Sequence, residues 1–243
     1  MAGPQITIYN DAHDLAGHAA DLIMSLAGDA IKTRGKFSIA FTGGSAIQET
    51  YGLLATRQPG DSDWSKWFAF MSDERYVPLD DPQSNFGMVK RTFLSHVPIP
   101  TTNIYPVPTQ LSLVEASKTY EWGIRKSLGG EIPTFDLILL GMGDDGHAAS
   151  LFPGAKNLKE NKALVSFGPP GTLPPPVDRV TFTFPLINAG RTVLFLIAGE
   201  KKRESLSHVL KPGTLVEKYP AAGVQPKPGK LIFLLDKAAA PAR

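Results

Sequence analysis

The side chains best placed to do chemistry in this chain follow a short apolar run at residues 135–140. Such a run is typical of a strand that is buried on both faces of a parallel sheet. Three glycines come after it, together with Asp144, Asp145 and His147. A neutral imidazole can accept a proton from water near neutral pH, and a neighbouring carboxylate stabilises the imidazolium that forms. A turn at Gly146 would let Asp145 and His147 face each other, which makes them the candidate acid–base pair.

Three other uses of these motifs fit the sequence less well. The segment GMGDDG matches the dinucleotide-binding pattern G-x-G-x-x-G, but its two aspartates would repel a pyrophosphate. The helix after it could span only residues 147–153, and no strand ending in an acidic residue follows about 20 residues later. Residues 43–47 (GGSAI) lack the last glycine of a serine-hydrolase nucleophile elbow. Two aspartates and one histidine fall short of the usual zinc motifs, so we expect no metal site.

The elements that must position these residues alternate between strand and helix patterns along the whole chain. This alternation predicts one α/β domain over residues 1–243, with a three-layer, Rossmann-like arrangement and a mainly parallel sheet. Strands are expected at 5–9, 36–41, 67–71, 135–140, 192–198 and 230–236, and residues 180–184 alternate as in a half-buried strand. Helices are expected after Asn10 or Asp11, from Ser45, over 86–97 and 113–128, and up to about Leu210.

Polar residues also follow other predicted strands, at the sheet edge where ligands of open α/β sheets bind. Gly43 and Gly44 precede a helix, and Ser45 opens a capping-box pattern, so backbone N–H groups could bind an anion there. A plain tight turn fits the same residues equally well. Arg75 lies in a charged cluster after the next strand. The proline-rich segment 167–176 fits a surface loop over a site better than a linker between domains.

The composition restricts the kind of partner. The chain has 25 Lys and Arg residues against 23 Asp and Glu, a net charge of +2 and no basic run, which argues against nucleic-acid binding. The absence of cysteine excludes disulfides, thiol nucleophiles and thiolate zinc sites. The first residues do not form a signal peptide, no apolar run is long enough to span a membrane, and the last residues do not match S-K-L. We therefore expect a cytoplasmic protein that binds no membrane.

Several segments together resemble the 6-phosphogluconolactonase family. They occur in the family's order and are TGGS (42–45), SDERYVP (72–78), SNFGMV (84–89), LLGMGDDGHAASLFPG (139–154), RVTFTFPLINAG (179–190) and AGEKK (198–202). The resemblance implies hydrolysis of 6-phospho-D-glucono-1,5-lactone to 6-phosphogluconate, the second step of the oxidative pentose phosphate pathway. It implies a small-molecule substrate, no metal or organic cofactor, and a fold like that of glucosamine-6-phosphate deaminase.

The resemblance also assigns roles by position. His147 would be the general base that activates water for attack on the lactone C1 carbonyl, and Asp145 would orient it. The substrate phosphate would be bound by a set of backbone groups and cations: Gly43, Gly44, Ser45, Arg75, Arg179 and Lys202, with Lys201 as an alternative to Lys202. We expect Asp144 to be an ordinary turn residue, Asp73 and Glu74 to organise Arg75, and the protein to be a monomer or a weak homo-oligomer.

Two alternatives share the same motifs. A deaminase-like isomerase of this type has A-F-N-E-P after the histidine, and its glutamate assists ring opening. The matching residues 148–153 carry no carboxylate, which favours lactone hydrolysis. A non-catalytic sugar-phosphate sensor would carry a DNA-binding helix-turn-helix, and the strand expected from Gln5 leaves no room for one before it.

Overall fold

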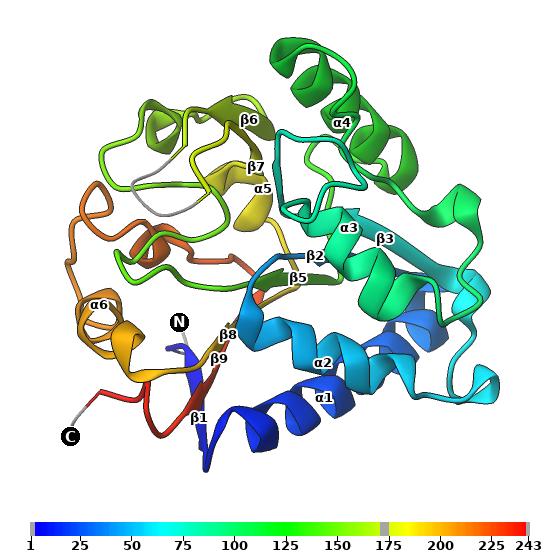
Figure 1. The fold of residues 1–243 in the computed structure, drawn as a ribbon, viewed down its shortest axis with the longest axis horizontal. Coiled ribbons are helices and arrows are strands. Elements are labelled where there is room, and N and C mark those ends of the chain that lie inside the picture. Colours follow the sequence, from blue (N-terminus) through cyan, green and yellow to red (C-terminus); the bar gives the residue numbers. More distant parts are fainter. Residues whose placement is uncertain (1–2, 171–174, 242–243) are drawn as a thin grey trace.

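A six-stranded parallel sheet forms the centre of the protein (Figure 1). The structure, a computed structural model, describes residues 3–170 and 175–241. The strand order is β1-β9-β8-β5-β2-β3, and every neighbouring pair is parallel. The strands are β1 (Gln5–Tyr9), β2 (Phe37–Phe41), β3 (Trp67–Met71), β5 (Leu137–Leu140), β8 (Thr192–Ile197) and β9 (Lys230–Asp236). The prediction of a mainly parallel α/β sheet is therefore confirmed.

The apolar runs correspond to the interior of this sheet. Every residue of β2, β5 and β8 is buried, because helices or the second sheet cover both faces. In contrast, β1 is an edge strand, and Ile6 and Ile8 in it remain 44% and 45% exposed.

Two of the helices begin where local signals predict, whereas the helix expected over 86–97 is α-helical only at residues 85–89. Helix α1 (Ala12–Arg34) begins after Asp11, whose carboxylate accepts the N–H of Asp14, and ends at Gly35 in a left-handed conformation. Helix α4 (Leu113–Leu128) begins with a capping box. The others are α2 (Ser45–Ala55), α3 (Asn85–Val89) with a π-helical continuation at Lys90–Leu94, α5 (Phe184–Ile187) and α6 (Arg203–Val209). In Figure 1, α1 and α2 lie on one side of the central strands and α4 on the other.

A second, antiparallel sheet was not predicted. It has the order β4-β7-β6 and contains β4 (Asp73–Arg75), β7 (Arg179–Phe182) and β6 (Val165–Gly168). Ser72 joins the two sheets, because its N–H donates to Phe41 of β2 and its carbonyl accepts from Phe182 of β7. The charged cluster after β3 is thereby held beside the carboxyl end of β2.

The half-buried strand expected at 180–184 is wrong in two respects. All four residues of β7 are buried, and the strand ends at Phe182. Phe184 instead begins α5, in which the following proline occupies a first-turn position that suits its fixed φ. Within the described residues, no helix is both long enough and apolar enough to cross a membrane.

Candidate active site

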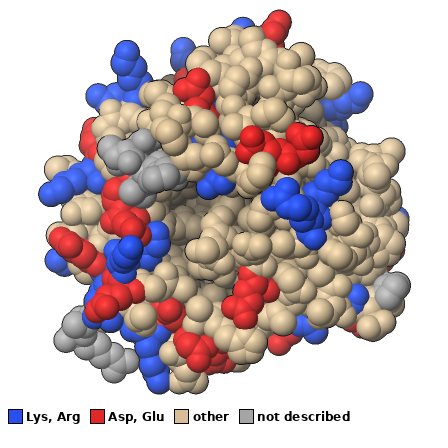
Figure 2. Space-filling view, in the orientation of Figure 1, with Lys and Arg blue, Asp and Glu red and all other residues tan. Residues whose placement is uncertain are grey.

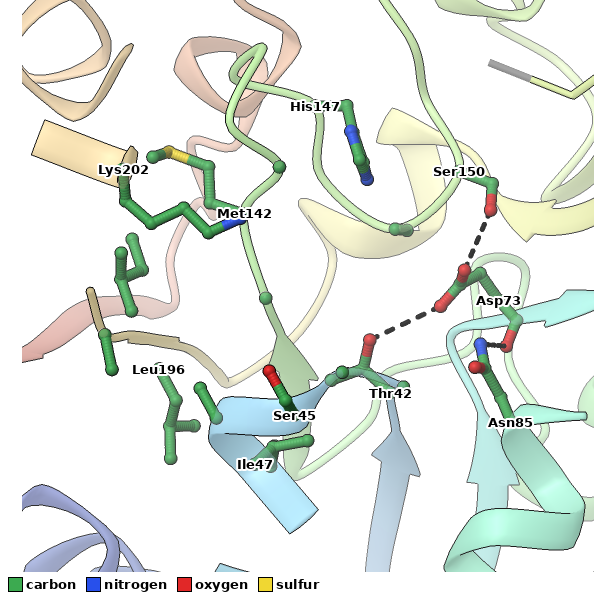
Figure 3. Close-up of a pocket in the computed structure, with 18 of the residues that line it drawn as sticks. Thr42, Ser45, Ile47, Asp73, Asn85, Met142, His147, Ser150, Leu196 and Lys202 are labelled. Atoms are coloured by element: carbon green, nitrogen blue, oxygen red, sulfur yellow. Dashed lines mark hydrogen bonds between the residues drawn. The ribbon is translucent and has the colours of Figure 1, made fainter. Parts of the chain in front are cut away.

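A cavity of about 220 Å³ opens at the carboxyl ends of the central strands (Figures 2 and 3). Figure 2 shows it as a hollow with Lys and Arg side chains beside it. The cavity brings together His147 and all six residues expected at the substrate phosphate: Gly43, Gly44, Ser45, Arg75, Arg179 and Lys202. Residues from five separate segments of the chain thus meet at one site, as the parallel topology requires.

Asp145 and His147 form the expected contact. The Nδ1 atom of His147 lies 2.6 Å from Oδ1 of Asp145, and the same oxygen accepts the His147 backbone N–H at 3.1 Å. The turn is possible because Gly146 has φ +80°. Burial raises the pKa of Asp145, whereas the hydrogen bonds and charge of His147 lower it. The lowering effects together are larger, so the pKa of Asp145 lies below its usual value. The carboxylate is therefore ionised at neutral pH, and the His147 ring extends into the cavity (Figure 3).

Gly143 explains another part of the motif. A Cβ atom at Gly143 would lie 2.1 Å from Nδ1 of His147 and 2.5 Å from Oδ1 of Asp145, so a side chain there cannot coexist with the pair. The ring of Phe152 lies against His147, with 4.6 Å between ring centroids. Residues 147–153 form turns rather than the helix that a dinucleotide-binding motif needs. Gly143 thus leaves room for the contact between Asp145 and His147.

Arg75 and Arg179 lie directly opposite each other on β4 and β7. Arg179 is only 3% exposed, its Nη2 donates to Pro175, and its buried Nη1 has no hydrogen-bond partner among the described residues. Burial lowers the pKa of Arg179 and the nearby Asp73 charge raises it, but a guanidinium stays protonated in proteins. Like charges opposite each other in a sheet are unfavourable, so this pair is suited to an anion. The surface loop expected at 167–176 begins later than predicted, because Phe167 and Gly168 belong to β6; residues 171–174 lie outside the described residues.

Lys202 is the lysine that lines the cavity, whereas Lys201 is exposed. The Nζ atom of Lys202 lies 2.6 Å from Oδ1 of Asp144. Asp144 is therefore more than the ordinary turn residue that we expected, since it pairs with a cation of the site.

The expectation of a capping box at Ser45 is wrong. Gly44 is the N-cap, with φ 121°, no side chain caps the helix, and Ser45 is the first helical residue. A hydroxyl at that position cannot perform the N-cap role, so the backbone N–H groups at the start of α2 remain available beside the cavity. Gly43 packs against the Asn85 amide, since a Cβ there would lie 1.9 Å from Asn85 Oδ1.

Asp73 has a role that we did not foresee. Its carboxylate accepts from the hydroxyls of Thr42 at 3.3 Å and Ser150 at 2.8 Å, and its carbonyl accepts from the Asn85 amide (Figure 3). It therefore joins the segments around the cavity and does not hold the Arg75 side chain. The only sequence signal for this role was a polar residue at the end of a strand.

Glu74 organises the backbone rather than the Arg75 guanidinium. Its fully buried carboxylate accepts the N–H groups of Arg75, Asn85 and Phe86 and the Ser84 hydroxyl. Burial raises its pKa to about 7, although the backbone hydrogen bonds oppose the shift. In the described parts of the chain, no three His, Asp or Glu side chains lie close enough together to hold a metal ion.

Comparisons with known proteins show the family to which the chain is similar. Residues 10–233 match the sequence model of the family described as glucosamine-6-phosphate isomerases/6-phosphogluconolactonase. A 6-phosphogluconolactonase from Nostoc sp. is 39% identical over 239 residues, which cover 96% of each chain. The solved structure of 6-phosphogluconolactonase from Trypanosoma brucei has a TM-score of 0.88 at 27% identity, and the match covers 98% of each chain.

A monomeric glucosamine-6-phosphate deaminase also matches in fold. Its TM-score is 0.80 at 20% identity, with 97% of this chain and 98% of that chain covered. This likeness confirms the expected fold and says nothing of activity. From the match to the family model and the nearly full-length relatives, the chain belongs to the glucosamine-6-phosphate isomerase/6-phosphogluconolactonase family.

Proposed function

We propose that this chain hydrolyses 6-phospho-D-glucono-1,5-lactone to 6-phosphogluconate, with His147 as the general base. The observation that carries the proposal is that His147, oriented by an ionised Asp145 at 2.6 Å, faces the same cavity as Arg75, Arg179 and Lys202. The family relatives named 6-phosphogluconolactonase support the same reaction.

The phosphate end of the substrate would lie at the start of α2 and near the two arginines. A phosphate dianion there gains backbone N–H donors, the positive end of the helix dipole and charge-assisted hydrogen bonds. It would also relieve the repulsion between Arg75 and Arg179, which face each other across β4 and β7. Binding one end of the substrate firmly places the lactone carbonyl at His147.

The reaction then needs one proton acceptor that later returns the proton. Nδ1 of His147 contacts Asp145, so Nε2 takes a proton from water while the water oxygen bonds to C1. The tetrahedral intermediate collapses, the bond from C1 to the ring oxygen breaks, and the imidazolium gives its proton to that oxygen. The products are a free C5 hydroxyl and the C1 carboxylic acid, which releases its proton to solvent and becomes the carboxylate.

The segment after His147 favours hydrolysis over isomerisation. Residues 148–153 contain no carboxylate to assist ring opening of an amino sugar. Ser150 in this segment instead donates to Asp73 and helps to form the cavity wall.

Substrate selectivity tests this proposal. The lactone is generated from glucose 6-phosphate and its dehydrogenase, with a no-enzyme control because the lactone opens spontaneously, and unphosphorylated glucono-1,5-lactone serves as the matched substrate. We expect kcat/KM to be at least about 10²-fold higher for the phosphorylated lactone, since several charge-assisted contacts are lost without phosphate. Ammonia release from glucosamine 6-phosphate, or equal rates on the two lactones, would contradict the proposal.

We further propose that the chain is a single domain that acts in the cytoplasm as a monomer or weak homo-oligomer, without nucleic-acid partners. The balanced charge of +2 supports the lack of nucleic-acid partners, and the lack of cysteine fits a reducing compartment such as the cytoplasm.

A further inference from the structure

The turn that carries Asp145 and His147 is also contacted from outside the cavity. A Cβ atom on Gly146 would lie 2.8 Å from Cδ1 of Tyr219 and 3.4 Å from its Cβ, so the Tyr219 side chain packs directly on this glycine. The Gly146 carbonyl accepts the N–H of Ala221 at 2.9 Å. The segment after α6 therefore packs against the backbone between the two members of the acid–base pair.

Tyr219 is itself held in place by α6. Its ring stacks on that of His208, with 4.6 Å between centroids and 12° between planes. His208 lies in α6, which begins directly after Lys202, and Lys202 pairs with Asp144 of the same turn. The turn is thus contacted on both sides of Asp145: at Asp144 by Lys202, which directly precedes α6, and at Gly146 by Tyr219, which stacks on α6.

A turn of this composition needs such support. Gly143 and Gly146 flank Asp145, and glycine has more backbone freedom than any other residue. The contact between Asp145 and His147 depends on this backbone, and a displacement of about 1 Å at a catalytic group can cost about 10²-fold in rate. The cavity lining does not include Tyr219, so its contact with Gly146 bears on the base and not on phosphate binding.

We propose that Tyr219 is a positioning residue for the reaction: its ring, stacked on His208, packs on Gly146 and keeps His147 and Asp145 in their productive geometry. This inference rests on the proposed function, in which His147 is the general base. It predicts a loss of kcat without a loss of binding when the ring is removed.

The test compares Tyr219→Ala, Tyr219→Leu and Tyr219→Phe with Tyr105→Ala. Tyr105 also stacks on an aromatic ring, that of Phe70, but does not line the cavity, so it controls for the loss of a packed tyrosine. For each variant, kcat for the lactone, the Kd of 6-phosphogluconate and Tm are measured. Tyr219→Leu replaces Tyr219→Ala if the alanine variant does not fold.

We expect Tyr219→Ala and Tyr219→Leu to lower kcat by about 10-fold to 100-fold, with Kd within about twofold of wild type. Tyr219→Phe keeps the aromatic ring, and its kcat should stay within about threefold of wild type. Tyr105→Ala should keep the wild-type kcat even if its Tm falls as far as that of Tyr219→Ala.

Three results would overturn the inference: wild-type kcat in folded Tyr219→Ala or Tyr219→Leu, an equal loss of kcat in Tyr105→Ala, or a loss of product binding as large as the loss of kcat. His147→Ala, measured in parallel, distinguishes a failure of the inference about Tyr219 from a failure of the proposed function. If His147→Ala keeps activity, the base is wrongly assigned; if it is inactive while Tyr219→Ala is unaffected, only the role of Tyr219 is wrong.

Discussion

At the scale of single residues, the candidate site depends on a glycine, Gly143, as well as on its ionisable side chains. Asp145 and His147 were identifiable from sequence because ionisable residues followed a buried strand, and the structure shows them in contact. The role of Gly143 was not identifiable, because it depends on the path of the His147 side chain above it. Asp73 was missed for a similar reason, since its partners Thr42 and Ser150 come from distant segments.

Gly143→Ala should lower kcat by about 10²-fold or more, because the new methyl would overlap Nδ1 of His147 and displace the base. Gly141→Ala is the matched control, since the atom nearest to its Cβ would be the Gly43 carbonyl oxygen at 3.8 Å, an ordinary contact. Steady-state kinetics on both variants tests this. Equal losses in the two would show that crowding at His147 is not the cause.

At the scale of elements, the strands of the large sheet were predictable and the small sheet was not. The buried strands β2, β5 and β8 are continuous apolar runs, which need no knowledge of their neighbours. Strands β4 and β6 are three and four residues long and lie among charged or polar residues, so their pairing depends on tertiary contacts. The start of α2 was misjudged because Gly44 adopts a conformation that the capping pattern does not reveal.

The pairing of β4 with β7 places two arginines at the cavity, and their loss should weaken binding more than catalysis. Arg75→Ala and Arg179→Ala should each weaken 6-phosphogluconate binding by about 1.5–3 kcal/mol, roughly 10-fold to 150-fold in Kd. Arg125→Ala is the control, because Arg125 pairs with Glu121 on α4 outside this cavity. Titration calorimetry measures all three, and unchanged affinity in both Arg75 and Arg179 variants would refute the phosphate assignment.

The contact between β4 and α3 should make stability depend on pH through Glu74. Burial raises its pKa from 4.5 to about 7, so the folded state holds the proton more tightly than the unfolded state. Its contribution to the free energy of unfolding is therefore full below about pH 4.5 and is lost as the pH rises through about 7.

Glu74→Gln does not titrate and so removes this dependence, although it will be less stable overall because an amide cannot accept every backbone N–H. From pH 5 to pH 8, the stability advantage of wild type over Glu74→Gln should shrink by about 2–3 kcal/mol. Denaturant unfolding of both proteins at several pH values measures this difference in the free energy of unfolding. Parallel pH profiles for the two proteins would mean that Glu74 keeps an ordinary pKa.

At the scale of the whole molecule, the two sheets share one core. Phe182 of the small sheet packs on Phe135 with 5.3 Å between ring centroids, and Tyr120 of α4 exchanges hydrogen bonds with the Met71 backbone of β3. The sequence predicts a single α/β domain, but the packing of the small sheet comes only from long-range contacts of this kind. These contacts place the cavity where the two sheets meet, and residues of both line it.

This shared core predicts that the chain unfolds in one transition. Tryptophan fluorescence reports on Trp64 and Trp67 in the core and on the exposed Trp122 of α4, and far-ultraviolet circular dichroism reports on all elements. The two denaturation curves should coincide, as expected for a cooperative unit. Separate midpoints would show that the small sheet unfolds independently and would contradict a single domain.

The most direct test of His147 as the general base is the effect of His147→Ala on catalysis and on product binding. The rate of lactone hydrolysis and the Kd of 6-phosphogluconate are measured on the same preparation. We predict that kcat falls by about 10²-fold to 10⁴-fold, the usual contribution of a general base, while Kd stays within about twofold of wild type. A kcat close to that of wild type would contradict the assignment of His147 as the base.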